Sequence, residues 1–199
     1  MEQQVSYPRI MDAAVPPTTA PAGIEGVMGY IGGARATRVW TVAEWLRFSH
    51  LAQFPVYVPD LGADPVAQAH EAVAEALRLG WAAHMPPAQT RLIIFDTETL
   101  IDRAWYATAA SIVGLSGFVA ADYGSLAFVL ENAAEIVIAA AWVSGSVIPP
   151  IPAGQTIQGL QWEANVVVEQ TLVDYSVFSP ALFARGGTGP RNAIRKQQS

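Results

Sequence analysis

The sequence predicts an α/β fold, a compact and irregular (β/α)8 TIM-like barrel in which loops replace some of the helices. Eight short apolar runs alternate with helical patterns along the chain, which is typical of a parallel α/β fold. The chain has 199 residues, enough for one domain with a sizeable core. A barrel of this type usually takes ~250 residues and at least about 200. We therefore expect shortened connections, and segments 13–23 and 147–154 are Pro-containing stretches without a helical pattern.

The eight apolar runs are the expected strands. Several are apolar on both faces, as strands covered on both sides must be. They are residues 9–12, 26–33, 54–60, 90–96, 117–122, 135–142, 156–162 and 168–174. An open, doubly wound sheet is the alternative arrangement. No Gly-rich phosphate-binding turn follows the first run, and this favours the barrel.

The helices expected between the strands carry recognisable signals at their ends. Thr41 and Glu44 have the spacing of a capping box ahead of the first helix. Asp64 and Pro65 open a longer helix, which Gly80 ends. Further helices are expected over residues 100–113, after a cap at Ser125, and from Ser179 and Pro180 onward.

Composition and charge narrow the class of protein. Hydrophobic residues make up 52% of the chain and charged residues 14%, which excludes a disordered protein and indicates that a partner could cover part of the surface. Residues 185–199 contain four basic residues and no acidic one. The rest, with 7 basic and 17 acidic residues, carries a charge of −10, which argues against nucleic-acid binding. We expect residues 1–184 to form a single barrel domain and residues 185–199 a flexible basic tail.

Several kinds of chemistry find no support. The chain contains no cysteine, so we expect neither disulfides nor thiolate chemistry. His50, His70 and His84 are scattered without metal-ligand spacing, and we expect no metal and no cofactor. The first residues lack the regions of a signal peptide, and the apolar run 136–142 is too short to span a bilayer. We expect a soluble protein that is made in the cytoplasm.

The fourth run carries the most informative pair of residues. Side chains alternate along a strand, so Asp96 and Glu98 share the inward face with Leu92 and Ile94. Two carboxylates at this spacing have α-carbons ~6.6 Å apart, and their repulsion raises the pKa of one of them. One proton donor beside one charged stabiliser is the arrangement that cleavage of an acetal bond requires.

Other predicted strands also end in polar or aromatic residues, and catalytic residues of barrels come from these ends. Carboxylates mixed with Trp and Tyr suit a sugar, because aromatic rings pack on sugar faces while carboxylates accept hydroxyl hydrogen bonds. A single Asp at a strand end is more often a cap or turn former, and we prefer that interpretation for Asp60 and Asp122. Trp142 and Trp162, taken singly, are better explained as rim core. The candidates at these ends are Asp12, Tyr30, Asp60, Asp122, Tyr123, Trp142, Gln161, Trp162 and Asp174.

The ordered series of these motifs resembles a known family. The sequence is similar to the glycoside-hydrolase-like barrels related to glycoside hydrolase family 25, the Chalaropsis-type lysozymes. It looks closest to the actinobacterial and actinophage branch known as domain of unknown function 1906. The resemblance covers roughly residues 5–178. The matching pieces are Asp12, residues 29–33, residues 40–45, residues 95–98, residues 123–125, residues 141–142, residues 161–162 and residues 173–174.

The resemblance implies a muramidase-like site without a cofactor. Glu98 would be the general acid/base, and Asp96 would orient and polarise the 2-acetamido group or stabilise the developing ring charge. Asp12 and Asp174 would complete an acidic bowl. Such enzymes retain configuration, with the acetamide of the substrate as nucleophile. The chain departs from the lysozymes after Asp12, where Ala-Ala-Val-Pro-Pro replaces a polar turn, and over residues 161–165. These departures concern catalysis more than the fold.

Two functions follow as hypotheses. The first is a phage-associated protein that hydrolyses or binds bacterial cell-wall polysaccharide, released to act on the wall or carried on the virion. The second is a catalytically inactive structural or receptor-binding tail component that contacts other virion proteins through its apolar surface or tail. The catalytic candidates are Glu98, Asp96 and Asp12. The substrate-binding candidates are Tyr30, Asp60, Tyr123, Trp142, Gln161, Trp162 and Asp174.

Overall fold

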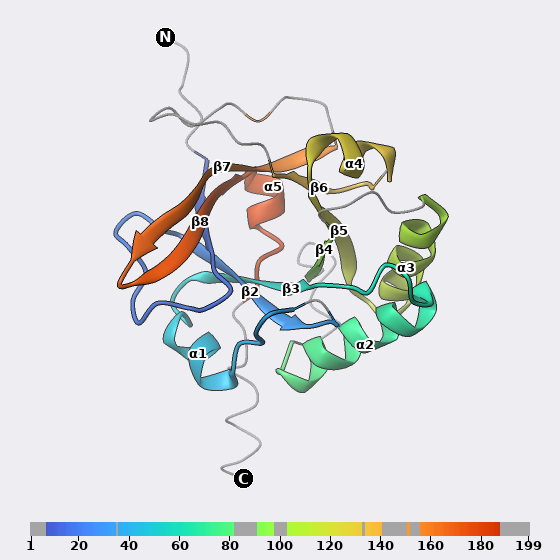
Figure 1. The fold of residues 1–199 in the computed structure, drawn as a ribbon, viewed down its shortest axis with the longest axis horizontal. Helices are drawn as coiled ribbons and strands as arrows, with labels where there is room; N and C mark the ends of the chain where they lie inside the picture. The colour runs from blue at the N-terminus through green and yellow to red at the C-terminus, as the bar shows by residue number, and fades with distance from the viewer. Residues whose placement is uncertain are drawn as a thin grey trace.

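Eight strands form a closed barrel in which each strand pairs with its neighbours along the chain (Figure 1). The computed structural model describes residues 7–34, 36–81, 91–97, 103–132, 134–140, 151 and 156–187. The strands are β1 (Arg9–Asp12), β2 (Gly26–Gly32), β3 (Ala52–Tyr57), β4 (Leu92–Asp96), β5 (Val119–Gly124), β6 (Val137–Ala139), β7 (Ile157–Val168) and β8 (Thr171–Phe178). The predicted fold class is confirmed, because the barrel is closed and carries few helices.

The helices are short and partly replaced by loops. They are α1 (Val42–Arg47), α2 (Pro65–Arg78), α3 (Arg103–Leu115), α4 (Leu126–Glu131) and α5 (Pro180–Phe183). Segment 13–23 contains neither helix nor strand, as predicted. The predicted loop at 147–154 and the first residues of the predicted helix 100–113 lie outside the described residues, except Ile151. Among the described residues, no helix is long and apolar enough to cross a membrane.

The predicted helix ends are confirmed by their hydrogen bonds. Thr41 and Glu44 form both halves of a capping box at the start of α1. The Asp64 side chain accepts hydrogen bonds from two backbone N–H groups in the first turn of α2, and Pro65 follows it. The Ser179 hydroxyl accepts the N–H of Leu182 at the start of α5. These short-range signals fix where the connections leave the barrel.

The last strand differs from a regular (β/α)8 arrangement. Strands β1 to β7 pair in parallel, but β8 runs antiparallel to both β7 and β1. The cause is the two-residue turn at Glu169 and Gln170, whose φ values of 48° and 68° suit a type I′ hairpin. The β7–β8 hairpin projects from the barrel on the side away from α3 (Figure 1). A tight hairpin leaves no room for a crossover helix, so β8 reverses direction.

Two apolar layers lie on the two faces of the strands. The inner one contains Leu92 and Ile94 with Phe54 and Phe178, whose rings pack edge to face with their centroids 4.9 Å apart. The outer one lies between strands and helices and contains Trp40, Trp45, Trp81, Ile93 and Phe95. The predicted alternation of β4 is therefore confirmed, and Asp96 continues its inner face.

One end of the barrel interior is closed by the C-terminal helix. Leu182 of α5 is fully buried with Ile10, Phe54 and Phe178 at the end where the parallel strands begin. The chain then returns to β3, where Gly187 and Gln53 exchange two backbone hydrogen bonds of 2.8 and 3.0 Å. Gly186 lies so close to Phe54 that an added Cβ would be 2.6 Å from the ring. The first three residues of the predicted tail thus lie against the barrel, and residues 188–199 lie outside the described part of the chain.

Candidate functional site

Acidic and aromatic side chains gather at the end of the barrel opposite α5. Asp12, at the end of β1, is paired with Met28 on β2 and with Asp174 on β8. Asp96, at the end of β4, is paired with Tyr123 on β5. Each continues the inward face of its strand, two residues beyond an apolar residue of the inner core. Strand pairing therefore brings Asp12 and Asp174 side by side and places Asp96 at the same end of the barrel.

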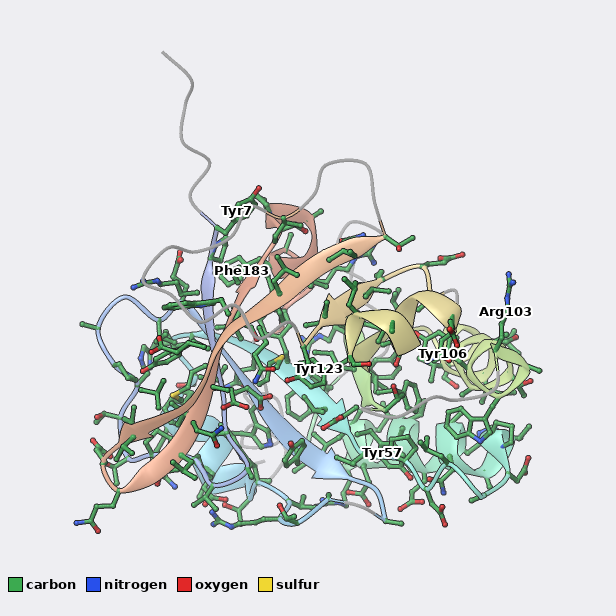
Figure 2. The ribbon with its side chains drawn as sticks, turned by 45° about the horizontal axis from the view of Figure 1, so that its top comes forward. Tyr7, Tyr57, Arg103, Tyr106, Tyr123 and Phe183 are labelled. Carbon is green, nitrogen blue, oxygen red and sulfur yellow. The ribbon has the colours of Figure 1, made fainter. Side chains whose placement is uncertain are left out.

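Tyr123 lies at the centre of this group. Its side chain is 5% exposed and sits between the strands in the middle of the molecule (Figure 2). Burial raises the pKa of its hydroxyl well above the usual range, and this effect is the largest. The further contributions come from the groups around it, namely Asp12, Asp96, Asp174 and Tyr30. Tyr123 thus stays protonated at any physiological pH and presents a hydrogen-bond donor to an acidic surround.

Asp96, the first residue of the predicted acidic pair, is buried at the end of β4. It is 4% exposed, and the Tyr30 hydroxyl donates a long hydrogen bond of 3.5 Å to its Oδ2. The next residue, Thr97, is fully buried and donates its N–H to the Tyr123 carbonyl at 2.9 Å. Glu98, the predicted general acid, lies outside the described residues, as does Trp142. The strand end that carries the pair is therefore held firmly up to Thr97.

Asp174 reaches the site by a different route from the one expected. It does not end its strand but lies in the middle of β8, and it arrives beside Asp12 because β8 is antiparallel. Its two oxygens accept hydrogen bonds of 2.7 Å from the Gln161 side chain and from the Asn165 backbone. Burial raises the pKa of Asp174, and the two hydrogen bonds oppose that shift. Gln161 therefore acts in this structure by holding Asp174.

Two of the predicted substrate-binding residues lie elsewhere. Asp60 is exposed in the loop after β3, where its carboxylate accepts the N–H of Gly62 at 3.0 Å and so shapes a turn. Trp162 faces the outer layer, stacked on Tyr175 at 6.0 Å with the Arg9 guanidinium 5.5 Å from its ring. Gln161 faces inward, so the next residue on the strand must face outward. Neither side chain joins the three carboxylates.

The contact of Asn165 with Asp174 was not predicted, and the interpretation of Asp122 as a cap or turn former was wrong. Asn165 has a φ of 58° within an irregular part of the β7–β8 ladder, and this turns its N–H toward Asp174. A bulge of this kind leaves no clear signal in the sequence. Asp122, interpreted as a cap or turn former, is instead a fully buried acceptor between β5, β4 and α4. Among the described residues, no group of three or more His, Cys, Asp and Glu side chains is arranged to hold a metal ion.

The site can supply proton donors and negative charge to a neutral ligand. Burial raises the pKa of Asp174 and so favours its protonated form, and Tyr123 remains a neutral donor. Tyrosine rings and carboxylates together match the apolar faces and hydroxyl groups of a sugar. This combination suits recognition of a carbohydrate or protonation of its glycosidic oxygen.

The chain has similar solved structures, although its sequence matches no protein-family model and no curated protein. An uncharacterized protein from B. stearothermophilus superposes with a TM-score of 0.71 at 16% identity, over 90% of this chain and 100% of that chain. A family 25 glycosyl hydrolase from Bacillus anthracis gives a TM-score of 0.58 at 10% identity, over 91% and 94% of the two chains.

A third structure adds a ligand to the comparison. The modular autolysin LytC from Streptococcus pneumoniae, solved in complex with a synthetic peptidoglycan ligand, gives a TM-score of 0.63 at 12% identity. The superposition covers 89% of this chain and 48% of LytC. At these identities the likeness establishes the fold alone. The chain is an irregular eight-stranded barrel that resembles those of glycoside hydrolase family 25, a fold that it shares with cell-wall hydrolases.

Proposed function

We propose that this protein binds and hydrolyses bacterial cell-wall glycan at the acidic end of its barrel, in the manner of a retaining muramidase. The observation that carries the proposal is the convergence of Asp12, Asp96 and Asp174 around Tyr123. The peptidoglycan ligand of LytC, which has the same fold, supports this class of substrate. We also infer that the relatives nearest in function belong to the branch called domain of unknown function 1906.

The proposed chemistry uses the acetamide of the substrate as nucleophile. Glu98 donates a proton to the glycosidic oxygen while the acetamide oxygen attacks the anomeric carbon, and the glycosidic C–O bond breaks. Asp96 accepts the acetamide N–H and compensates the positive charge of the cyclic intermediate. Water then attacks the anomeric carbon, the bond between that carbon and the acetamide oxygen breaks to restore the acetamide, and the proton of the water passes to the Glu98 carboxylate. The configuration at the anomeric carbon is retained because it is inverted twice.

The remaining groups of the site bind and orient the sugar. The protonated Tyr123 hydroxyl is a donor for an acetamide or hydroxyl oxygen. Asp12 and Asp174 accept sugar hydroxyl groups, and Gln161 and the Asn165 backbone hold Asp174 in place for this role. Tyr30 orients Asp96 through its hydroxyl.

A second candidate is glycan binding without turnover, as in an adhesion module of a phage particle. The observation that favours it is the depth of burial: Asp12 is only 7% exposed and Asp96 only 4% exposed. Access of a polymer to such buried carboxylates demands an opening of the rim. A protein that only binds the end of a glycan chain does not need such an opening of the rim.

The decisive experiment is release of muropeptides from purified actinobacterial cell walls. The wild-type protein is expected to release reducing ends, and Glu98→Gln is expected to lower the rate by at least about 100-fold. The matched control is Asp60→Asn, because this exposed turn residue keeps its acceptor oxygen and lies away from the carboxylates. Binding of the walls by wild type without release of reducing ends would replace hydrolysis by the second candidate. If the protein neither releases reducing ends nor binds the walls, both candidates are wrong.

A further inference from the structure

A further buried carboxylate, Asp122, lies directly behind the candidate site, on the outer face of the barrel. Asp122 on β5 is fully buried and is paired with Phe95 on β4 and Val137 on β6. Its Oδ1 accepts the Thr97 hydroxyl at 2.9 Å, and its Oδ2 accepts the Asn132 side-chain amide at 2.8 Å. The carboxylate therefore ties the end of β4 to the end of α4.

Thr97 is the residue between Asp96 and Glu98, and both its backbone and its side chain are hydrogen-bonded to β5. Its N–H is bonded to the Tyr123 carbonyl at 2.9 Å. Its hydroxyl lies 2.9 Å from Asp122 and 3.3 Å from the same Tyr123 carbonyl. Hydrogen bonds therefore hold both the backbone and the side chain of Thr97. The backbone that presents the acidic pair is thereby locked to β5.

The surroundings of Asp122 make this carboxylate costly to the folded state. Burial raises its pKa to about 6, and the hydrogen bonds from Asn132 and Thr97 oppose the shift. Among the described residues its carboxylate is in no salt bridge. On its α3 side lies Tyr106, whose own pKa is raised by burial and by the charges of Asp122 and Glu135. A buried charge without a cation beside a candidate site points to a functional role.

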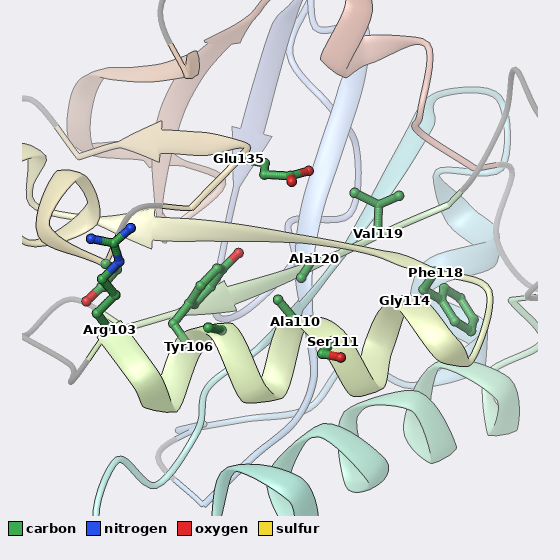
Figure 3. A pocket seen from close by; sticks show the side chains of 11 residues that line it. Arg103, Tyr106, Ala110, Ser111, Gly114, Phe118, Val119, Ala120 and Glu135 are labelled. Atoms are coloured by element: carbon green, nitrogen blue, oxygen red, sulfur yellow. The ribbon is translucent and has the colours of Figure 1, made fainter.

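A cavity that is lined in part by Asn132, a hydrogen-bond partner of Asp122, lies on this side of β5. Tyr106 and Asn132 line a cavity of about 440 Å³ between α3 and β5. In Figure 3 Tyr106 rises from α3 toward β5, with Glu135 beyond it and the small side chains of Ala110 and Ala120 along the cavity.

We propose that Asp122 is a positioning residue, which holds Thr97 and thereby the backbone that presents Asp96 and Glu98 to the glycan. An aliphatic residue at position 122 would avoid the cost of the buried charge but could not accept the Thr97 hydroxyl. The inference rests on the proposed function. It assigns a role to a residue that touches no substrate.

The test uses a series at positions 97 and 122 of the full chain. Thr97→Val keeps the shape of the side chain and removes the hydroxyl, whereas Thr97→Ser keeps the hydroxyl and serves as the rescue. We expect Thr97→Val to lower kcat on the order of 100-fold with little change in KM, because small misplacements of reacting groups have effects of this size. Thr97→Ser and Asp122→Asn, which both keep the hydrogen bond, should stay within about threefold of wild type. Equal kcat for Thr97→Val and Thr97→Ser would overturn the inference while leaving the proposed function intact.

A second variant and a second measurement keep the outcome clear. If Thr97→Val alone does not fold, the double variant Asp122→Asn/Thr97→Val takes its place. It removes the buried charge together with the hydroxyl, and the amide at position 122 can still form a hydrogen bond with Asn132. Amide hydrogen exchange at Asp96 and Thr97 reports how firmly this backbone is held to β5, and it does not require catalytic activity. We expect exchange at least about tenfold faster in both Val variants than in Thr97→Ser. If wild type proves inactive, the proposed function fails, and unchanged exchange in the Val variants would then overturn the inference as well.

Discussion

The two ends of the barrel are built from the same strands and yet differ in chemistry. At the end closed by α5, Phe54, Phe178 and Leu182 fill the interior with apolar contacts. At the opposite end the same inward faces finish in Asp12, Asp96 and Tyr123. One end is thus filled by apolar side chains that stabilise the fold, while the other carries buried acidic and tyrosine side chains. Barrels in general divide stability and chemistry in this way.

The largest effect is expected when the apolar end is broken. Phe178→Ala removes a fully buried ring that packs edge to face on Phe54, and it should lower the free energy of unfolding by about 3–5 kcal/mol. Urea denaturation followed by fluorescence measures this change. The pKa of Tyr123, followed by ultraviolet titration, should remain raised in the folded variant. A normal Tyr123 pKa there would show that the two ends are not separate.

A smaller effect is expected from the buried acid behind the site. The pKa of Asp122 is raised from 3.8 to about 6, so the carboxyl is stabilising below about pH 4 and this contribution is lost as pH rises through 6. The difference of about two units corresponds to roughly 3 kcal/mol. Wild type should therefore lose roughly 3 kcal/mol relative to Asp122→Asn between pH 4 and pH 7. Urea denaturation at a series of pH values measures this change. If the free energies of unfolding of the two proteins vary with pH in the same way, the buried charge does not destabilise the fold.

The smallest effect is expected at the rim. Asp174→Asn removes one charge from the acidic group, while the hydrogen bond from Asn165 survives and the Gln161 amide can turn over. We expect the free energy of unfolding at pH 7 to change by no more than about 1 kcal/mol. The pKa of Tyr123 should fall toward its ordinary value, because one of the charges that raise it is gone. Thermal unfolding and titration of the same sample check both parts, and an unchanged Tyr123 pKa would contradict the proximity of Asp174.

Features with a short sequence range were predictable. The capping box at Thr41 and the caps at Asp64 and Ser179 depend on contacts within three residues, and all three are present. The inward face of β4 follows from the two-residue repeat of a strand, and that repeat correctly places Asp96. The direction of β8 was not predictable in the same way, because one turn decides whether a chain continues or reverses.

Local periodicity was therefore enough to predict the barrel and to place Asp96, since the geometry of a single strand sets which side chains share a face. The tertiary structure alone showed that an antiparallel β8 carries Asp174 to Asp12, that Trp162 faces outward and that Asp122 lies behind Thr97. These relations depend on the register between strands that are far apart in the sequence. Register follows from barrel closure, β-bulges and the packing of both apolar layers together, and no single segment contains that information.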